Sequence, residues 1–436
     1  MSRPSTADPD EQGIDVPPYF LCPISLQIMR DPVTLPTGIT YEREAIDEWI
    51  FSKKEERRPT CPVTMQPLAV DGGELTPNHT LRRLIQAWCV AHASHGVERF
   101  PTPRPPLDKA QIAKLLNEGR GTRSQMQASF RKLRLIVDES ERNRRCAEAA
   151  GAPDFLVSVV RMSTVSCPSS DEEKSTSGWW NEESTGDCLQ EALRILHSLQ
   201  ISPRAWSELM VRNPGLVELL TAVLKRGDYQ PRAFATFLLN SIFQALEPHN
   251  LLNPKEDLFV ELVKVVRDKI SHKATKVALR GLSRLCAWGR NHIKAADAGG
   301  VRVLVELLLD ETDKNMCDRV LVLLDQLCGC AEGRAELLGH PAGLALVSKK
   351  ILRVSPLATE RAVRVLHSVS RFSATPAVVQ EMMQVGIVSK LCLLLQVNCG
   401  SKIRERAKEV LRLHAGVWKN SPCIHAQLLA SYPTHH

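Results

Sequence analysis

The longest regular pattern in the chain is a series of apolar stripes at helical spacing, which runs from Asp108 to Trp418. Within it, a short helix, a glycine-containing turn and a strongly apolar helix recur. The recurring segments are RRCAEAAGAPDFLVSVV, WSELMVRNPGLVELLTAVL, IKAADAGGVRVLVELLL, RAELLGHPAGLALVSKKIL and VVQEMMQVGIVSKLCLLL. Longer amphipathic stretches lie between them. The pattern predicts a mostly α domain over residues 108–418, built from repeated helical units.

The spacing of the turn glycines gives the length of the repeat. Gly300, Gly343 and Gly386 follow one another at 43-residue steps, and Gly215 precedes Gly300 by 85 residues, about twice that step. The copy between Gly215 and Gly300 is weakened and is centred on Leu258. This period is typical of armadillo or HEAT repeats, and a glycine turn followed by an LVELL-type helix resembles the armadillo type more closely. We therefore expect about six repeats that stack into an α-solenoid, with their third helices lining a groove.

One acidic, Ser/Thr-rich insertion, residues 163–187, interrupts the period. Its low apolar content predicts a disordered loop, and Trp179-Trp180 leaves a docking loop as the alternative. Three other segments are polar or rich in proline. They are expected to form a disordered N-terminus (1–14), a linker (91–107) and a loosely ordered tail (419–436).

Residues 15–90 follow a different pattern. The segments DPVTL and TGIT read as two short strands around a turn at Gly38, and a helix that ends near Trp49 follows them. Asn78 is expected to cap a last helix. The apolar stripe of that helix would consist of Leu81, Leu84, Ile85 and Trp88. The sequence thus predicts a small ββα domain with a closing helix.

The cysteines and histidines of this domain do not support a zinc site. The candidates between residues 15 and 95 are Cys22, Cys61, Cys89, His79, His92 and His95, and they include no Cys-x2-Cys pair. A structural zinc needs four ligands that converge in a tetrahedron. Cys22 and Cys61 are therefore interpreted as packed thiols, and neither has a histidine within ten residues that would activate a nucleophile. No metal or other cofactor is expected.

Three blocks carry a family resemblance, namely FLCPISLQIMRDPVTLPTGITYEREAIDEWI, TCPVTMQPL and LTPNHTLRRLIQAW. In order and spacing they resemble the U-box, the zinc-free, RING-like domain with which ubiquitin ligases engage a conjugating enzyme. Together with the repeats, they make the chain similar to the short class of plant U-box ubiquitin ligases with armadillo repeats. The resemblance implies that the conjugating enzyme binds Ile24, Leu26, Trp49, Pro62 and Val63. It implies structural roles for Cys22, Asp31, Pro32, Gly38 and Asn78.

The resemblance also implies a mechanism without a catalytic residue on this chain. A ubiquitin ligase of this type brings a substrate lysine close to the thioester on the conjugating enzyme, so that its contribution is positioning. Met65 departs from the family pattern, because many active relatives have a basic or hydrogen-bonding residue there. Methionine cannot donate a hydrogen bond. Either Gln66 substitutes for it or activation is weaker, and a non-catalytic armadillo scaffold or adaptor with a weakened U-box is the alternative function.

Composition limits the partners and the location. A net charge of +7 without a recognised nucleic-acid motif favours no nucleic-acid partner, and no stretch approaches the ~20 apolar residues of a membrane span. The 13 scattered cysteines fit a reducing compartment. We expect a cytoplasmic protein, with the nucleus or the periphery of membranes as alternatives. The expected partners are a conjugating enzyme carrying ubiquitin, a protein substrate on the armadillo groove and, by resemblance, a second copy bound through the U-box. The resemblance further implies a role in stress or immune signalling.

Overall fold

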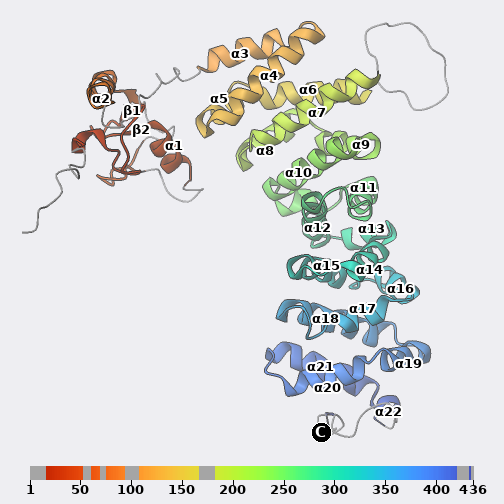
Figure 1. The fold of residues 1–436 in the computed structure, drawn as a ribbon. Helices are drawn as coiled ribbons and strands as arrows, with labels where there is room; N and C mark the ends of the chain where they lie inside the picture. Colours follow the sequence, from red (N-terminus) through yellow and green to blue (C-terminus); the bar gives the residue numbers. More distant parts are fainter. Residues whose placement is uncertain are drawn as a thin grey trace, which may run out of the picture. The chain divides into compact units, whose positions relative to one another are not determined.

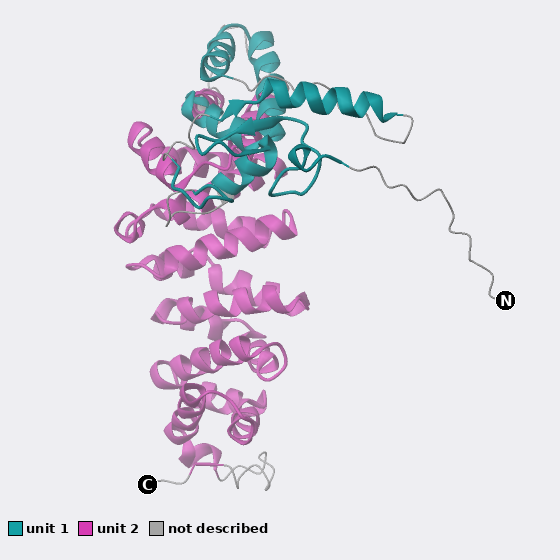
Figure 2. Cartoon of the chain, turned by 90° about the vertical axis from the view of Figure 1, so that its left-hand side faces the viewer, with its two compact units in different colours: residues 1–152 teal, residues 153–436 magenta. Residues whose placement is uncertain are grey.

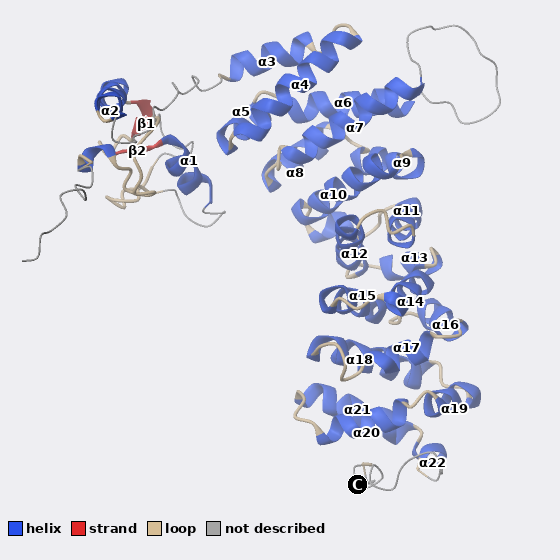
Figure 3. Cartoon of the chain, in the orientation of Figure 1, coloured by secondary structure: helices blue, strands red, loops and turns tan. Residues whose placement is uncertain are grey.

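The computed structural model describes residues 16–52, 60–68, 75–93, 108–165, 182–419 and 432–433. Helices dominate, and the strands form one small sheet (Figure 3). The chain divides into two compact units, residues 1–152 and 153–436 (Figure 2). The predicted mostly α fold, with a small sheet near the N-terminus, is confirmed.

The segments that were expected to be disordered fall largely on residues that are not described. The N-terminal segment 1–14 lies outside the described residues, as do most of the linker and the tail and the Trp179-Trp180 pair. The expectation for the insertion was too wide, because α6 extends to Val165 and α7 begins at Glu182. At the first limit, the hydroxyls of Ser163 and Thr164 donate to the carbonyls of Val159 and Val160 within α6.

The first unit begins with the small domain. Its elements are η1 (Pro18–Phe20), β1 (Pro32–Thr34), β2 (Thr40–Glu42), α1 (Arg43–Ser52), β3 (Thr76–Pro77) and α2 (His79–Ala91). The sheet has the order β2-β1-β3 with antiparallel pairs, and Val33 lies opposite both Tyr41 and Pro77. The two-residue strand β3 was not predicted. It forms only because Thr76 and Pro77 lie opposite Thr34 and Val33 of β1. Two residues are too few to show the alternation of apolar and polar side chains that marks a strand in a sequence.

The small domain has its own hydrophobic core. The buried members are Phe20, Cys22, Met29, Val33, Leu35, Tyr41, Ile46, Ile50, Cys61, Leu68, Ile85 and Cys89. The predicted stripe of α2 is wrong at Leu84, whose side chain is 53% exposed. Ile85, which belongs to the predicted stripe, is buried in the core, and so is Cys89 four residues later. All three segments of the sequence resemblance contribute to this one core, which ties them into a single domain.

Helices make up most of the described residues after α2 (Figure 1). Their bounds are α3 (Lys109–Glu118), α4 (Arg123–Glu139), α5 (Glu141–Ala149), α6 (Ala152–Val165), α7 (Glu182–Ser198), α8 (Pro203–Arg212), α9 (Leu216–Arg226), α10 (Tyr229–Ala245), η3 (Pro248–Leu251), α11 (Glu256–Arg267), α12 (His272–Cys286), α13 (Asn291–Asp297), α14 (Gly300–Asp310), α15 (Lys314–Leu327), α16 (Ala331–Gly339), α17 (Gly343–Lys350), α18 (Pro356–Phe372), α19 (Pro376–Gln384), α20 (Ile387–Gln396), α21 (Ser401–Leu413) and α22 (Ala415–Trp418).

The second unit repeats a three-helix module. The short first helices are α8, α13, α16 and α19, and the apolar second helices are α9, α11, α14, α17 and α20. The long third helices pack on one another in the order α7, α10, α12, α15, α18 and α21. Because each module buries its apolar face only against its neighbours, the core is continuous along the stack. The weakened copy at Leu258 is α11, which η3 precedes in place of a first helix.

The turn glycines serve two different purposes. Gly386 caps α20 at φ 74°, a left-handed conformation that glycine adopts without a steric penalty. Gly343 is instead helical, and a Cβ on it would lie 2.2 Å from the carbonyl oxygen of Leu337. The turn at Gly386 bends α19 and α20 by 62°. Among the described residues, no single helix is long and apolar enough to cross a bilayer, and this bent pair reaches that length only as two helices.

Candidate functional site

Two loops of the small domain have the same sequence pattern and the same backbone structure. Loop A is residues 22–27 (CPISLQ) and loop B is residues 61–66 (CPVTMQ). In both loops the cysteine N–H donates to the glutamine carbonyl at 2.9 Å, and the N–H of the fifth residue donates to the cysteine carbonyl at 2.8 and 2.9 Å. Isolated antiparallel bridges close both loops, between Leu21 and Ile28 and between Thr60 and Pro67. The domain therefore presents one turn structure twice.

The apolar tips of these loops are held in a strained conformation. Leu26 in loop A and Met65 in loop B both have φ 56°, which is uncommon for residues other than glycine. Their side chains are 74% and 65% exposed. Such a conformation costs about 1–3 kcal/mol and concentrates at binding sites. The positive φ was not predicted, although the duplicated CPxxxQ pattern is a signal from which a paired structure follows.

Trp49 connects the end of α1 to loop B. Its indole Nε1–H donates to the carbonyl oxygen of Thr60 at 3.0 Å, directly before the loop. Trp49 and Ile24 are both partly buried and pack against the same core cluster. Val63 is 54% exposed, whereas Pro62 beside it is half-buried. The structure thus joins Trp49 by a hydrogen bond to the residue before loop B, and joins Ile24 of loop A to Trp49 through the shared core.

Cys61 is a hydrogen-bonding centre of the small domain. Its sulfur lies 3.1 Å from the Tyr41 hydroxyl and accepts from the Thr37 hydroxyl at 3.4 Å and the Thr64 N–H at 3.5 Å. Burial of the Cys61 thiol opposes ionisation, but these hydrogen bonds together lower its pKa to about 6. Burial also raises the pKa of Tyr41 above its usual value. The hydrogen bonds anchor loop B to the turn before β2.

Cys22 and Glu42 anchor loop A and the segment after it. The sulfur of Cys22 accepts from the Glu42 N–H at 3.2 Å. The Glu42 carboxylate accepts from the backbone N–H groups of Arg30 and Asp31, the latter at 3.1 Å. Glu42 was not singled out from the sequence, because its partners are backbone groups twelve and eleven residues away. Its single carboxylate links two segments of the chain, a role that a zinc ion fills in other small domains.

The remaining structural residues fix the sheet and α2. Asp31 forms an ion pair with Arg43 at the start of α1, and Asn78 Oδ1 accepts from the Leu81 N–H at 3.0 Å as the cap of α2. Pro32 is buried in β1, and its carbonyl accepts from the Asn78 N–H at 2.8 Å. Gly38 has φ 81° in the turn between the strands. These contacts hold the loops on a rigid support.

The second unit contributes a different surface along its third helices. Phe237 on α10 lies 5.1 Å from the ring of His197 on α7, and Lys273 on α12 lies 5.0 Å from the Phe237 ring centre. Burial and the Lys273 charge lower the pKa of His197. On α10, the buried Oδ1 of Asn240 has no hydrogen-bond partner. The surface combines aromatic area with a nearby cation, which suits a polypeptide ligand.

Comparison with known proteins places this architecture. Residues 16–94 match the U-box domain, and residues 110–434 match the "Plant U-box protein ARM repeat region". Two proteins of Arabidopsis thaliana, the E3 ubiquitin-protein ligases PUB23 and PUB22, are each 46% identical to 97% of this chain, which covers 98% and 100% of their lengths. The chain belongs to the plant U-box ubiquitin ligases with armadillo repeats. The ligase is also 35% identical to E3 ubiquitin-protein ligase PUB24 of the same plant, over 97% of both chains.

The ligase is expected to be insensitive to chelators. Among the residues that the structure describes, no three His, Cys, Asp or Glu side chains are placed to hold a metal ion. Treatment with EDTA should therefore leave the melting temperature of the U-box and its rate of ubiquitin transfer unchanged, because hydrogen bonds to Cys22, Cys61 and Glu42 replace metal coordination. A zinc-dependent RING ligase in the same buffers is the control. Loss of the U-box melting transition in EDTA, restored by zinc, would contradict this prediction.

Proposed function

We propose that the U-box of this ligase binds a ubiquitin-charged conjugating enzyme through Ile24, Leu26, Trp49, Pro62 and Val63. The observation that carries the proposal is the pair of loops with the same backbone structure and strained, exposed apolar tips, with Trp49 bonded to the residue before loop B. A few apolar and aromatic side chains on a rigid support are what a transient interface with a small number of dominant contacts requires. Two Arabidopsis relatives that match over nearly their full lengths are named E3 ubiquitin-protein ligases, which supports the same function.

The mechanism in this proposal is one of positioning. The amine of a substrate lysine attacks the carbonyl carbon of the thioester, an amide bond forms, and the conjugating enzyme's cysteine leaves as a thiol. No side chain of the ligase forms a covalent bond in this step. The ligase raises the effective concentration of the lysine and restricts the orientation of the thioester-linked ubiquitin.

Met65 is expected to limit the activity of the ligase. Its thioether is exposed at the tip of loop B and cannot donate a hydrogen bond to ubiquitin. Met65→Arg should raise the rate of ubiquitin discharge to free lysine by about tenfold, since a charge-assisted hydrogen bond contributes about 1.5–3 kcal/mol. Met65→Leu, which preserves the apolar volume, is the matched control and should behave as wild type. An unchanged rate in Met65→Arg would indicate that Gln66 or another neighbour already supplies the donor.

The armadillo repeats are proposed to bind the protein substrate along the third helices. The aromatic cluster around Phe237, with Lys273 over its ring, supports this placement. Further along the same face, the hydroxyl of Ser283 on α12 donates to Oε1 of Gln326 on α15 at 3.0 Å. These two polar residues lie 43 positions apart, which is the length of one repeat. An extended peptide that crosses successive repeats would meet this row of side chains.

The wider context of the ligase is also proposed from its family. The similarity to the short plant class supports a role in stress or immune signalling and a cytoplasmic location, with the nucleus or membrane surfaces as alternatives. A homodimer through the U-box is part of the same proposal. A ubiquitination assay with a panel of conjugating enzymes tests the function: polyubiquitin ladders support it, and their absence across the panel favours the non-catalytic adaptor.

A further inference from the structure

The second unit lacks one helix that its own repeat pattern calls for. The first helices α8, α13, α16 and α19 have 10, 7, 9 and 9 residues, whereas the module of α11 has only the four-residue η3 in this place. The sequence here is EPHNLLNPK, with Pro248 and Pro254 six residues apart. Proline removes a backbone donor and disfavours a helical conformation in the residue before it. A first helix therefore cannot form between α10 and α11.

The segment that replaces the helix is held against the following repeat. The Asn291 side-chain amide on α13 donates to the carbonyl of Leu251 at 2.6 Å. The Lys294 ammonium donates to Asn253 Oδ1 and to the Pro254 carbonyl, both at 2.7 Å. These three bonds fix residues 251–254 on α13. The space on the opposite side, next to α8 and α9, is left unfilled.

A cavity of about 810 Å³ occupies that space. It is lined by α8, α9, the end of α10, the η3 segment, the start of α11 and the end of α12. Buried apolar side chains, including Phe243, Leu258 and Leu285, contribute to it, as does Val211 on α8, whose side chain is 83% exposed. Two ion pairs among the lining residues connect α9 to the start of α11 and to the residue directly before it. They are Lys225–Asp257 at 2.7 Å and Lys255–Glu218 at 3.3 Å.

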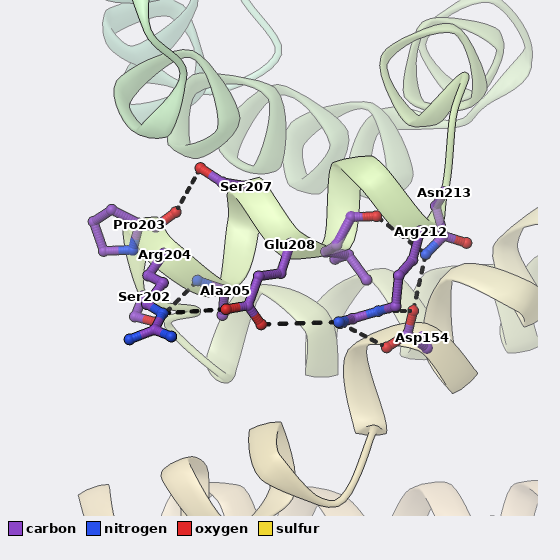
Figure 4. A network of polar contacts seen from close by, with 10 residues as sticks. Asp154, Ser202, Pro203, Arg204, Ala205, Ser207, Glu208, Arg212 and Asn213 are labelled. Atoms are coloured by element: carbon purple, nitrogen blue, oxygen red, sulfur yellow. Dashed lines mark hydrogen bonds and ion pairs between the residues drawn. The ribbon is translucent and has the colours of Figure 1, made fainter.

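The α8 wall of the cavity is rigid. Ser202 caps the helix by accepting from the Ala205 N–H, and Arg204 pairs with Glu208 at 3.2 Å (Figure 4). At the other end of α8, Asp154 on α6 accepts from the Asn213 side chain at 2.9 Å and pairs with Arg212 at 3.0 Å (Figure 4). This polar network holds α8 from the side of the preceding repeat. Val211 is thereby presented on a fixed helix and not on a mobile loop.

We propose that this cavity, the α11 cavity, binds a short amphipathic helix of a partner protein, which completes the module as its missing first helix. Two of the four described first helices, α8 and α19, show a chemistry that fits such a place, whereas α13 and α16 bury no pair of large apolar side chains. In α8 the buried pair is Trp206 and Leu209, and in α19 it is Val379 and Met382, in each case three residues apart. The partner helix therefore presents two large apolar side chains at positions i and i+3. Two turns of helix, about 11 Å long, carry such a pair.

The lining favours a helix over a small polar ligand. The volume alone is in the range of small-molecule sites, but such sites offer a few convergent polar groups that orient the ligand. Here four of the five charged lining residues are paired with one another. Among the described residues, no cavity-lining side chain has a buried polar atom without a partner. The cavity thus offers apolar area and few directed polar contacts, as a helix-binding groove does.

Synthetic peptides that copy residues 202–213, 330–340 and 375–385 of this chain test the proposal. Fluorescence anisotropy with the full-length ligase should show saturable binding of at least one peptide with a Kd of about 10–100 μM, as expected for a short helix in a groove. Trp206→Ala with Leu209→Ala in the 202–213 peptide should abolish its binding. If no peptide binds at 1 mM, where even a binding free energy of roughly −4 kcal/mol would give half-saturation, the proposal is overturned.

Variants of the cavity locate the binding. Val211→Glu should weaken binding by about tenfold, because it places a charge beside the apolar pair. Val397→Glu, which alters a 46% exposed valine at the end of α20, is the matched control and should bind as wild type. Ala222→Trp should fill the cavity and abolish binding, and circular dichroism checks its fold. Peptide binding that is unaffected by Val211→Glu and by folded Ala222→Trp would overturn the assignment, as would cavity-dependent binding of a small apolar dye without binding of any peptide.

Discussion

Val63→Asp is expected to reduce ubiquitin transfer by about a hundredfold while the U-box remains folded. Val63 is 54% exposed on loop B, so that an aspartate there does not enter the core. In an apolar interface with the conjugating enzyme, however, the carboxylate loses its hydration without gaining a partner. A cost of about 3 kcal/mol corresponds to a hundredfold loss of affinity. The measurement is the initial rate of auto-ubiquitination at a low concentration of conjugating enzyme, together with a thermal melt.

Val90→Asp is the matched control for this variant. Val90 is 49% exposed on α2, and the same change there should leave the rate at its wild-type value. Ile24→Ala and Trp49→Ala should also abolish binding of the conjugating enzyme, but both side chains pack against the core and Trp49 bonds to Thr60. Their effects therefore combine lost contacts with lost stability. A wild-type rate for Val63→Asp, or an equal loss in Val90→Asp, would remove loop B from the interface.

Deletion of residues 108–436 is expected to separate the two functions of the ligase. The buried core cluster of the U-box lies wholly between Phe20 and Cys89, so residues 1–107 retain it. Auto-ubiquitination should therefore continue. Ubiquitination of a substrate that the full chain modifies should fall by about a hundredfold, because the armadillo repeats no longer raise its effective concentration at the thioester.

The complementary fragment provides the control for the deletion. Residues 108–436 alone should bind the same substrate but transfer no ubiquitin to it. Both fragments are assayed at equal concentration with the same conjugating enzyme, and binding is measured by pull-down of the purified substrate. Undiminished substrate turnover by residues 1–107 would show that recognition lies in the U-box and would contradict the proposed division of labour.

The sequence predicted those features that depend on local pattern. The 43-residue steps between glycines gave the solenoid, and the three blocks around Cys22, Cys61 and Asn78 gave the U-box; the comparisons confirm both. Apolar spacing determines which face of a helix is buried, and a cap is a contact between residues three apart. The prediction failed at Leu84, where apolar spacing allowed a wider stripe than the small core of the U-box can bury.

The features that escaped prediction depend on contacts between distant residues. Glu42 binds backbone N–H groups of residues 30 and 31, and Cys61 receives hydrogen bonds from the segment around residue 37. The α11 cavity exists because residues 251–254 bind to α13 and not to α8. Pro248 and Pro254 indicate that a helix is missing, but only the placement of the replacing segment shows which side remains open. Local propensity contains no information about these choices.

The most direct test of the central claim is auto-ubiquitination by the purified full-length ligase, with and without EDTA, beside Val63→Asp and Val90→Asp. The account predicts polyubiquitin ladders from the wild type and from Val90→Asp that EDTA does not change, and ladders that form about a hundredfold more slowly from Val63→Asp. This result would establish a zinc-free ligase that acts through loop B. Ladders that disappear in EDTA, or that Val63→Asp forms at the wild-type rate, would contradict the account.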